Sequence, residues 1–301
     1  MEKQKLGNVK QIISAYQMEM KDGSSSGKRF VLVHNGGLEV AFNADNALDI
    51  AWVKYYGQNI SFLSKVGFNS NAGVFRQKFE GGFLYTCGID NVSGCESDKI
   101  VHGSLHHKKA QNVNVKTDDE KVVVSAEVVN SYLFGDNVLM TRNYIVYSDR
   151  IEVHDSLKNE GFTPADYVIL YHVNFGYPML DKGMELAFDE KETIPANEKT
   201  KNTLHLAKVI TDPVLNDTED LYYHILNKGA VKLKNDKIGI EVDMSFDTKS
   251  FPYLVEWRNL VPGDYVLGIE PSTTRFDEYK KNTLSPNQTD NFDITFDFKK
   301  F

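Results

Sequence analysis

Two residues that could exchange protons lie beside apolar segments of the sequence that end in turn residues. His172 lies in the aromatic run Leu170–Pro178, which ends in glycine and proline, where binding sites are often displayed. Glu270 follows the apolar run Tyr265–Ile269, and burial there would raise the pKa of its carboxyl toward the range useful to a general base. Imidazole exchanges protons readily near neutral pH. The pair could therefore perform general acid–base chemistry; the alternatives are a structural histidine and a carboxylate in a salt bridge or turn.

Four further side chains could bind a polar ligand. His102 precedes Gly103, which permits close approach of the backbone. Arg76 could bind a ligand hydroxyl through its fork of N–H donors, or lie on the surface. Asp90 could serve a ligand or a salt bridge, and Trp257 could stack on a sugar ring or fill the core. Imidazole, carboxylate, guanidinium and indole groups together favour a neutral ligand with many hydroxyl groups.

Motifs for several other chemistries are missing from the sequence. It has no Gly-x-Gly-x-x-Gly, no Gly-x-x-x-x-Gly-Lys-Ser/Thr and no Gly-x-Ser-x-Gly, so dinucleotide, P-loop nucleotide and hydrolase-elbow chemistry have no support. The two cysteines, Cys87 and Cys95, do not form a Cys-x-x-Cys zinc motif. His106 and His107 are adjacent, and adjacent strand residues point to opposite faces, so they make a poor metal site. We expect no metal, and structural roles for the other histidines: His34, His154, His205 and His224.

The composition narrows the possible partners and the compartment. The 301 residues carry 34 Lys and Arg against 42 Asp and Glu, a net charge of −8, which disfavours nucleic acid as a partner. No apolar run approaches about 18 residues, so we expect no membrane span. The N-terminus lacks the apolar core of a signal peptide, and two cysteines suit a reducing compartment, so we expect a cytoplasmic protein. The sequence does not indicate an oligomeric state.

These side chains must be positioned by β-strands, because the dominant hydrophobic period is two. Apolar residues alternate with polar ones over Lys237–Phe246 and over Asn291–Phe298, as in half-buried antiparallel strands. Closely spaced β-rich runs, without a fixed repeat or a linker, predict an all-β fold: a large antiparallel β-sandwich that spans residues 1–301 as a single domain. Locally we expect a strand over Leu204–Ile210, a loop over Asp181–Thr203, and over Ala47–Tyr56 a hairpin, with a helix as the minority alternative.

The order of the candidate residues resembles that of the aldose 1-epimerase, or galactose mutarotase-like, superfamily. The matching positions are Arg76, His102-Gly103, His172 on an aromatic strand, and Gly268-Ile269-Glu270. The resemblance covers roughly Gly36 to Thr274 and is closer still to an uncharacterised branch of the superfamily, over the segments Phe79–Asn91, His172–Pro178 and Gly268–Thr273. It implies a β-supersandwich with an open cleft and epimerisation at C1 of a small carbohydrate without a cofactor.

The resemblance also implies roles for the residues. Glu270 would be the general base that takes the proton of the C1 hydroxyl, and His172 the general acid that protonates the ring oxygen. The ring would open, the C1–C2 bond would rotate, and closure would give either anomer. His102 and Arg76 would hydrogen-bond the sugar. The further substrate-binding candidates are Asp90, Asn174 and Trp257, and the aromatic residues expected near the sugar are Trp257, Phe175 and Tyr177.

Two other functions on the same fold stay open. A non-catalytic sugar-binding or regulatory protein would bind through Trp257, Arg76 and His102 and would tolerate the loss of Glu270. A sugar isomerase or lyase would instead take a proton from carbon. The identity of the sugar does not follow from the sequence, although the net charge of −8 disfavours a highly anionic one.

Overall fold

The computed structural model describes residues 3–71, 73–94, 100–278 and 280–301, so Cys95 lies outside the described residues. Antiparallel sheets of 13, 5 and 2 strands make up most of it. The strands are β1 (Ile13–Glu19), β2 (Arg29–Asn35), β3 (Leu38–Asn43), β4 (Asp49–Tyr55), β5 (Gln58–Asn59), β6 (Phe62–Leu63), β7 (Gly81–Gly82), β8 (Leu84–Ile89), β9 (Gln111–Thr117), β10 (Val122–Ser131), β11 (Asn137–Val146), β12 (Arg150–Asn159), β13 (Ala165–Gly176), β14 (Glu185–Pro195), β15 (Asp220–Asn235), β16 (Ile240–Phe246), β17 (Tyr253–Val261), β18 (Asp264–Ser272), β19 (Asn282–Leu284) and β20 (Thr289–Lys300). The helical segments are short: the 3-10 helices η1 (Lys3–Lys5), η2 (Val9–Gln11), η3 (Gly23–Ser25), η4 (Phe75–Gln77), η5 (Leu105–His107) and η6 (Leu204–Leu206), and the α-helix α1 (Glu198–Asn202).

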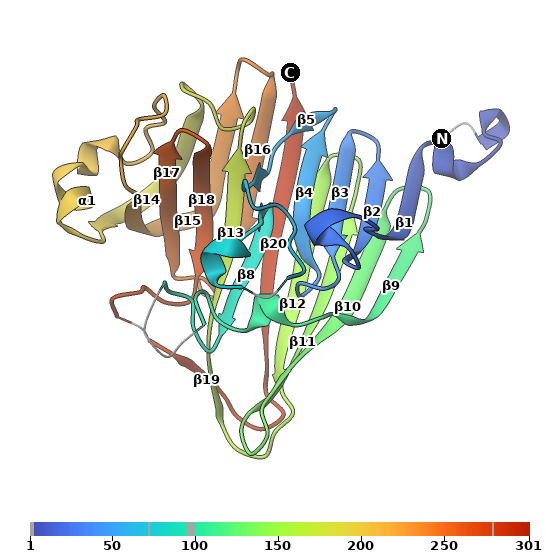
Figure 1. Cartoon of the computed structure of the whole chain (residues 1–301), viewed down its shortest axis with the longest axis horizontal. Coiled ribbons are helices and arrows are strands. Elements are labelled where there is room, and N and C mark those ends of the chain that lie inside the picture. The colour runs from blue at the N-terminus through green and yellow to red at the C-terminus, as the bar shows by residue number, and fades with distance from the viewer. Residues whose placement is uncertain (1–2, 72, 95–99, 279) are drawn as a thin grey trace.

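The two larger sheets pack face to face. The 5-stranded sheet runs β1-β2-β3-β4-β5, and the main path of the 13-stranded sheet runs β19-β13-β18-β17-β15-β16-β20-β12-β11-β10-β9. In Figure 1 the blue small sheet lies over the right half of the large one. Aromatic rings join them, with the Phe42 and Tyr144 centroids 4.7 Å apart and those of Tyr55 and Phe298 5.6 Å apart. The predicted all-β antiparallel sandwich is confirmed.

The left half of the large sheet in Figure 1 carries β13, β17 and β18, and β13 has neighbours on both sides. It pairs with β18 on one side and with β8 on the other. Within the part of the chain that the structure describes, no helix is long and apolar enough to cross a membrane.

Three local expectations have different outcomes. The segment around Ala47–Tyr56 is a hairpin, since β4 pairs with β5. The loop expected over Asp181–Thr203 is wrong, because it contains the whole of β14, paired with β15, and α1. Only one residue of β14 is fully buried and the others are half-buried or exposed, so the strand lacks the alternation of apolar and polar residues that would predict it.

The strand expected over Leu204–Ile210 is also wrong, because this segment begins with η6. Nη1 of Arg258 donates hydrogen bonds to the carbonyl oxygens of Leu206 and Val209, the latter at 2.8 Å. A side chain thus takes the place of a neighbouring strand as the partner of these backbone groups.

Candidate active site

His172 and Glu270 face each other on neighbouring strands. Asn174 of β13 lies opposite Gly268 of β18, so the antiparallel register brings His172 and Glu270 opposite each other as well. Nε2 of His172 lies 3.1 Å from Oε1 of Glu270. The two residues are only 4% and 1% exposed. Two groups that can each carry a proton therefore share one nearly water-free point of the sheet.

Gly268 makes this approach possible. A Cβ atom at that position would lie 2.3 Å from Oε1 of Glu270, 3.0 Å from Cε1 of His172 and 3.2 Å from Cε3 of Trp257. The first of these distances is far inside van der Waals contact. The missing side chain of Gly268 is thus the space that the carboxylate, the imidazole and the indole share.

Several polar atoms of the site have no hydrogen-bond partner among the described residues. They are Nδ1 of His172, Oδ1 of Asn174 and Oε1 of Glu270, whose 3.1 Å contact with Nε2 of His172 is an ion-pair distance without hydrogen-bond geometry. The amide group of Asn174 is otherwise held, since its Nδ2 donates to the carbonyl oxygen of His172 at 3.1 Å. A buried polar atom left unpaired costs about 1–3 kcal/mol, so such atoms are rare unless a ligand completes them. Three on adjacent strands indicate a binding site for a polar ligand.

Burial decides the charge state of the pair. It raises the pKa of Glu270 well above its ordinary value, and the negative charge of Glu219 adds to this effect. It lowers the pKa of His172 well below its ordinary value, and His102 contributes in the same direction. The pair therefore holds its single exchangeable proton on the carboxyl group, beside a neutral imidazole.

Aromatic rings surround His172. The ring centroids of Trp257, His102 and Phe79 lie 5.3, 5.6 and 6.0 Å from that of His172. Trp257 comes from β17, Phe79 from the segment after η4, and His102 from the loop before η5. These rings exclude water from the proton-carrying pair.

The conformation of the His102 loop depends on its backbone angles and on contacts with neighbouring backbone carbonyl groups. His102 has a positive φ of 61° and Nδ1 lies 3.1 Å from the carbonyl oxygen of Val92. Because a carbonyl oxygen only accepts, Nδ1 must carry the hydrogen, and Nε2 of a neutral ring is left as an acceptor. Burial lowers the pKa of His102 and so favours that neutral ring. Gly103 follows with φ 82°, and a Cβ there would lie 2.3 Å from the carbonyl oxygens of Gly88 and Asn91.

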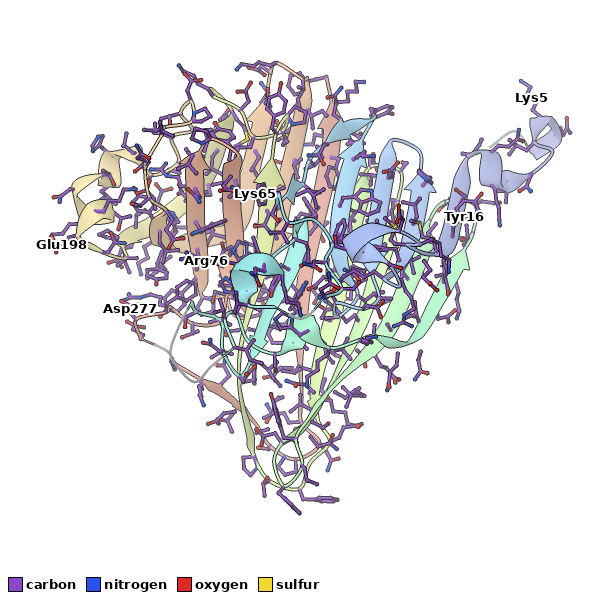
Figure 2. All side chains as sticks on the ribbon, in the orientation of Figure 1. Lys5, Tyr16, Lys65, Arg76, Glu198 and Asp277 are labelled. Carbon is purple, nitrogen blue, oxygen red and sulfur yellow. The ribbon has the colours of Figure 1, made fainter. Side chains whose placement is uncertain are left out.

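Asp90 and Arg76 take other positions. Oδ1 of Asp90 accepts hydrogen bonds at 2.8 Å from the backbone N–H and the hydroxyl of Ser104, so Asp90 supports the His102 loop. Arg76 lies on η4, where its side chain is exposed and has no hydrogen bond or ion pair with a described residue (Figure 2). The neighbouring Phe75 ring contacts that of His102, with centroids 5.1 Å apart.

The structure brings together five of the seven predicted site residues: His172, Glu270, His102, Asn174 and Trp257. Phe175 was expected near a ligand, and this is wrong, because its side chain points to the other face of β13 and packs against Phe83 between the sheets. Tyr177 lies beyond the end of β13 and is largely exposed.

Two residues at the site have no signal in the sequence. Oε2 of Glu219 accepts a hydrogen bond from Nε1 of Trp257 at 2.9 Å. In the sequence, however, Glu219 lies in the polar run Asn216–Asp220, which predicts a loop. Tyr85 of β8 lies opposite His172 and resembles any other buried strand tyrosine in sequence. Pairing of β8 with β13 could have identified Tyr85, but one sequence does not give strand pairing. Among the described residues, no three His, Cys, Asp or Glu side chains are arranged to hold a metal ion.

The fold is a galactose mutarotase-like β-sandwich, as the resemblance in sequence implies. A Klebsiella pneumoniae protein named provisionally as an aldose 1-epimerase superimposes with a TM-score of 0.86 at 20% identity, over 95% of this chain and 83% of that one. A galactose mutarotase-like protein from Clostridium acetobutylicum gives 0.69 at 15% identity, over 97% and 100%. Galactose 1-epimerase from Lactobacillus acidophilus gives 0.65 at 11% identity, over 96% and 99%.

Within this fold the chain belongs to the family described as a domain of unknown function, DUF4432, which it matches over residues 25–290. No curated protein matches the sequence. At these identities the solved structures define the fold alone, so the function must be argued from the site.

Proposed function

We propose that the chain is an aldose 1-epimerase, which interconverts the α and β anomers of a small carbohydrate by acid–base opening of the sugar ring. The observation that carries the proposal is the unsatisfied His172–Glu270 pair. Ring opening removes a proton from the C1 hydroxyl and delivers one to the ring oxygen. Both oxygens are bonded to C1, so the two protein groups must lie close together, as Nε2 and Oε1 do at 3.1 Å.

The proton count of the pair suits a reversible reaction. In opening, the Glu270 carboxylate takes the C1 hydroxyl proton while the His172 imidazolium gives one to the ring oxygen. In closure, the Glu270 carboxyl group gives its proton to the aldehyde oxygen while the neutral His172 takes one from the ring hydroxyl. The two states differ only in which residue holds the proton. Burial favours the neutral state in the sugar-free protein, which is the state that closes a ring.

The other predicted residues would bind and orient the sugar. Nε2 of His102 and Oδ1 of Asn174 are acceptors for its hydroxyl groups, and the Trp257 indole forms one wall. Arg76 is exposed on η4, and its long side chain would have to extend toward the sugar to bind it. Asp90 would act through the His102 loop, since it bonds Ser104.

The test is exchange NMR on sugars at anomeric equilibrium. We expect cross-peaks between α and β signals that grow with protein concentration, for at least one member of a panel of aldoses, sugar phosphates and sulfonated sugars. A panel without any enhanced exchange contradicts the proposal. Saturation transfer without exchange would indicate a non-catalytic sugar-binding protein, and deuterium appearing at C2 in heavy water would indicate an isomerase.

A further inference from the structure

His106 lies against Tyr85, one of the residues of this site, and between two carboxylates. Its Nδ1 lies 2.7 Å from Oδ2 of Asp49, and its Nε2 lies 3.2 Å from Oε1 of Glu80; all three side chains are nearly fully buried. Burial would lower the pKa of His106, but the Glu80 and Asp49 carboxylates outweigh it and raise the pKa above its ordinary value. Both ring nitrogens face acceptors, so each must carry a hydrogen, and the ring is an imidazolium.

This charged ring is stacked on Tyr85. The two centroids are 3.5 Å apart and the planes differ by 14°. Tyr85 lies opposite His172 in the register of β8 and β13. Its ring also contacts Phe79 at 5.4 Å and His102 at 6.0 Å, between centroids. A cation over an aromatic face is attracted to it, so the His106 ring fixes the ring that faces the site.

The chain connects His106 to the same site a second time. His106 lies on η5, four residues after His102, so it anchors the loop that carries His102. Its partner Glu80 directly follows Phe79 in the chain. The imidazolium therefore holds two of the three segments whose rings lie against His172, those of Phe79 and His102.

The other partner, Asp49, belongs to a rigid frame. Its Oδ1 accepts a hydrogen bond from Nη1 of Arg142, whose Nη2 donates to Oδ2 of Asp155 at 2.9 Å. The hydroxyl of Tyr171, the residue before His172, donates to the same Asp155 oxygen. The imidazolium is thus tied to β4, β11, β12 and β13 through buried side chains.

We propose that His106 is a positioning residue of the site, whose imidazolium clamps Tyr85, Phe79 and the His102 loop against His172; the inference rests on the proposed epimerase function. His106 itself does not contact the sugar. It determines where the rings around the reacting pair lie, and a misplacement of about 1 Å can reduce a rate on the order of 10²-fold.

The clamp depends on pH because it depends on the charge of His106. The groups around it are the carboxylates of Asp49 and Glu80, the stacked Tyr85 ring, whose hydroxyl burial keeps protonated, and the neutral His107, whose pKa burial lowers to about 4. Lys28 and Arg142 lie behind the two carboxylates. As pH rises through the raised pKa of His106, the ring loses a proton and one of its two carboxylate bonds. Epimerase activity therefore has an alkaline limb set by His106.

Two variants and a matched control test the clamp. His106→Gln removes the charge, and Glu80→Gln keeps an acceptor but removes one of the two negative charges that hold the proton. His224→Gln changes a histidine that is equally buried beside a glutamate, on the opposite face of the sheet. We expect His106→Gln to lose on the order of 10²-fold in kcat with a much smaller change in KM. We expect Glu80→Gln to move the alkaline limb to lower pH, and His224→Gln to leave kcat and the pH profile unchanged.

A second measurement keeps the clamp and the epimerase function separate. In sugar-free protein labelled with ¹⁵N-histidine, His106→Gln is expected to shift the side-chain signals of His102 and His172, whereas His224→Gln is not. Unchanged signals, or an alkaline limb that stays in place in Glu80→Gln, would overturn the clamp. A wild type that exchanges no sugar would overturn the epimerase function, while the histidine spectra would still decide on the clamp. If His106→Gln does not fold, Glu80→Gln gives both readouts.

Discussion

Two histidine–glutamate pairs lie in the large sheet at the same separation but on opposite faces. Nε2 of His172 lies 3.1 Å from Oε1 of Glu270, and Nε2 of His224 lies 3.1 Å from Oε2 of Glu256. None of the four side chains is more than 5% exposed. Glu256 alternates along β17 with Trp257, whose indole lies beside His172, so the second pair points away from the first. Residue type, distance and burial do not distinguish the two pairs.

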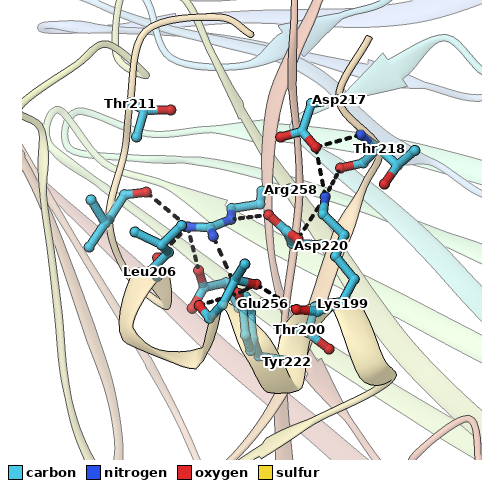
Figure 3. A network of polar contacts seen from close by, with 12 residues as sticks. Lys199, Thr200, Leu206, Thr211, Asp217, Thr218, Asp220, Tyr222, Glu256 and Arg258 are labelled. Carbon is cyan, nitrogen blue, oxygen red and sulfur yellow. Dashed lines mark hydrogen bonds and ion pairs between the residues drawn. The ribbon is translucent and has the colours of Figure 1, made fainter.

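The difference lies in the remaining polar atoms. Nδ1 of His224 is 2.9 Å from the hydroxyl of Thr193, and Oε1 of Glu256 accepts the backbone N–H of Lys208 at 3.0 Å. Nη1 of Arg258 lies 3.8 Å from Oε1 of Glu256, and Nε of the same arginine pairs with Asp220, so that Glu256 belongs to a wider polar network (Figure 3). The His172–Glu270 pair has unpartnered atoms at both residues. A pair completed by its own chain holds the fold together, whereas an incomplete pair is available to a ligand.

The largest expected effect comes from removing the reactive groups of the incomplete pair. Glu270→Gln and His172→Asn should each reduce anomeric exchange by about 10²–10⁴-fold, since a positioned acid or base contributes that much. The free energy of unfolding should not fall by much, because Oε1 of Glu270 and Nδ1 of His172 have no hydrogen bond with the described residues that the substitutions would remove. Exchange NMR with urea unfolding measures both. Exchange that survives in Glu270→Gln would assign the proton transfer elsewhere.

Gly268→Ala should have the next largest effect, because it displaces the pair without removing either group. The new Cβ would need the space that Oε1 of Glu270 occupies at 2.3 Å. We expect a loss of about 10²-fold in kcat although Glu270 and His172 both keep their side chains. Gly7→Ala is the matched control, because no described residue lies within 4 Å of the added Cβ and the backbone there does not have a positive φ. Equal activity of the two variants would contradict the role of Gly268.

The sequence predicts the strands better than the side-chain environments. The alternation over Asn291–Phe298 and the apolar run before Glu270 correctly predict strands β20 and β18, because burial of a strand leaves a local pattern in the sequence. The run before Glu219 is polar, so its contact with Trp257 depends on the pairing of β15 with β17, which is a long-range contact. His224 and His106 likewise differ from His172 only through partners far away in the chain. Strand register, rather than residue type, separates a site from a structural pair.

Substitutions in the complete pair, His224 and Glu256, should lower the stability of the protein and leave its activity unchanged. Glu256→Gln leaves the hydrogen bonds of His224 and of the Lys208 backbone with a weaker partner, and His224→Asn leaves the Thr193 hydroxyl without its partner. Each should reduce the free energy of unfolding by about 1–3 kcal/mol. Urea unfolding followed by circular dichroism measures the loss. The proposal that this pair is structural fails if either variant has wild-type stability but slow exchange.

The pH dependence of stability is a further test of the incomplete pair, His172 and Glu270. Burial, and then the charge of Glu219, raises the pKa of Glu270 above its ordinary 4.5 in the folded protein, so above pH 4.5 the unfolded chain binds fewer protons than the folded one. The free energy of unfolding should therefore fall as pH rises from 4.5 toward the raised pKa, by up to about 1.4 kcal/mol per pH unit. His172 acts oppositely below its ordinary 6.5, because its lowered pKa lets the unfolded chain bind the proton first. The wild-type curve should steepen above pH 6.5, where the opposing effect of His172 ends; subtracting the curve of Glu270→Gln isolates the carboxyl group, and that difference should fall from pH 4.5 onward. Glu219→Gln should end the fall at a lower pH, because it removes the second cause of the raised pKa. A flat difference curve would mean that Glu270 is ionised in the sugar-free protein, and ring opening rather than closure would then match the resting site.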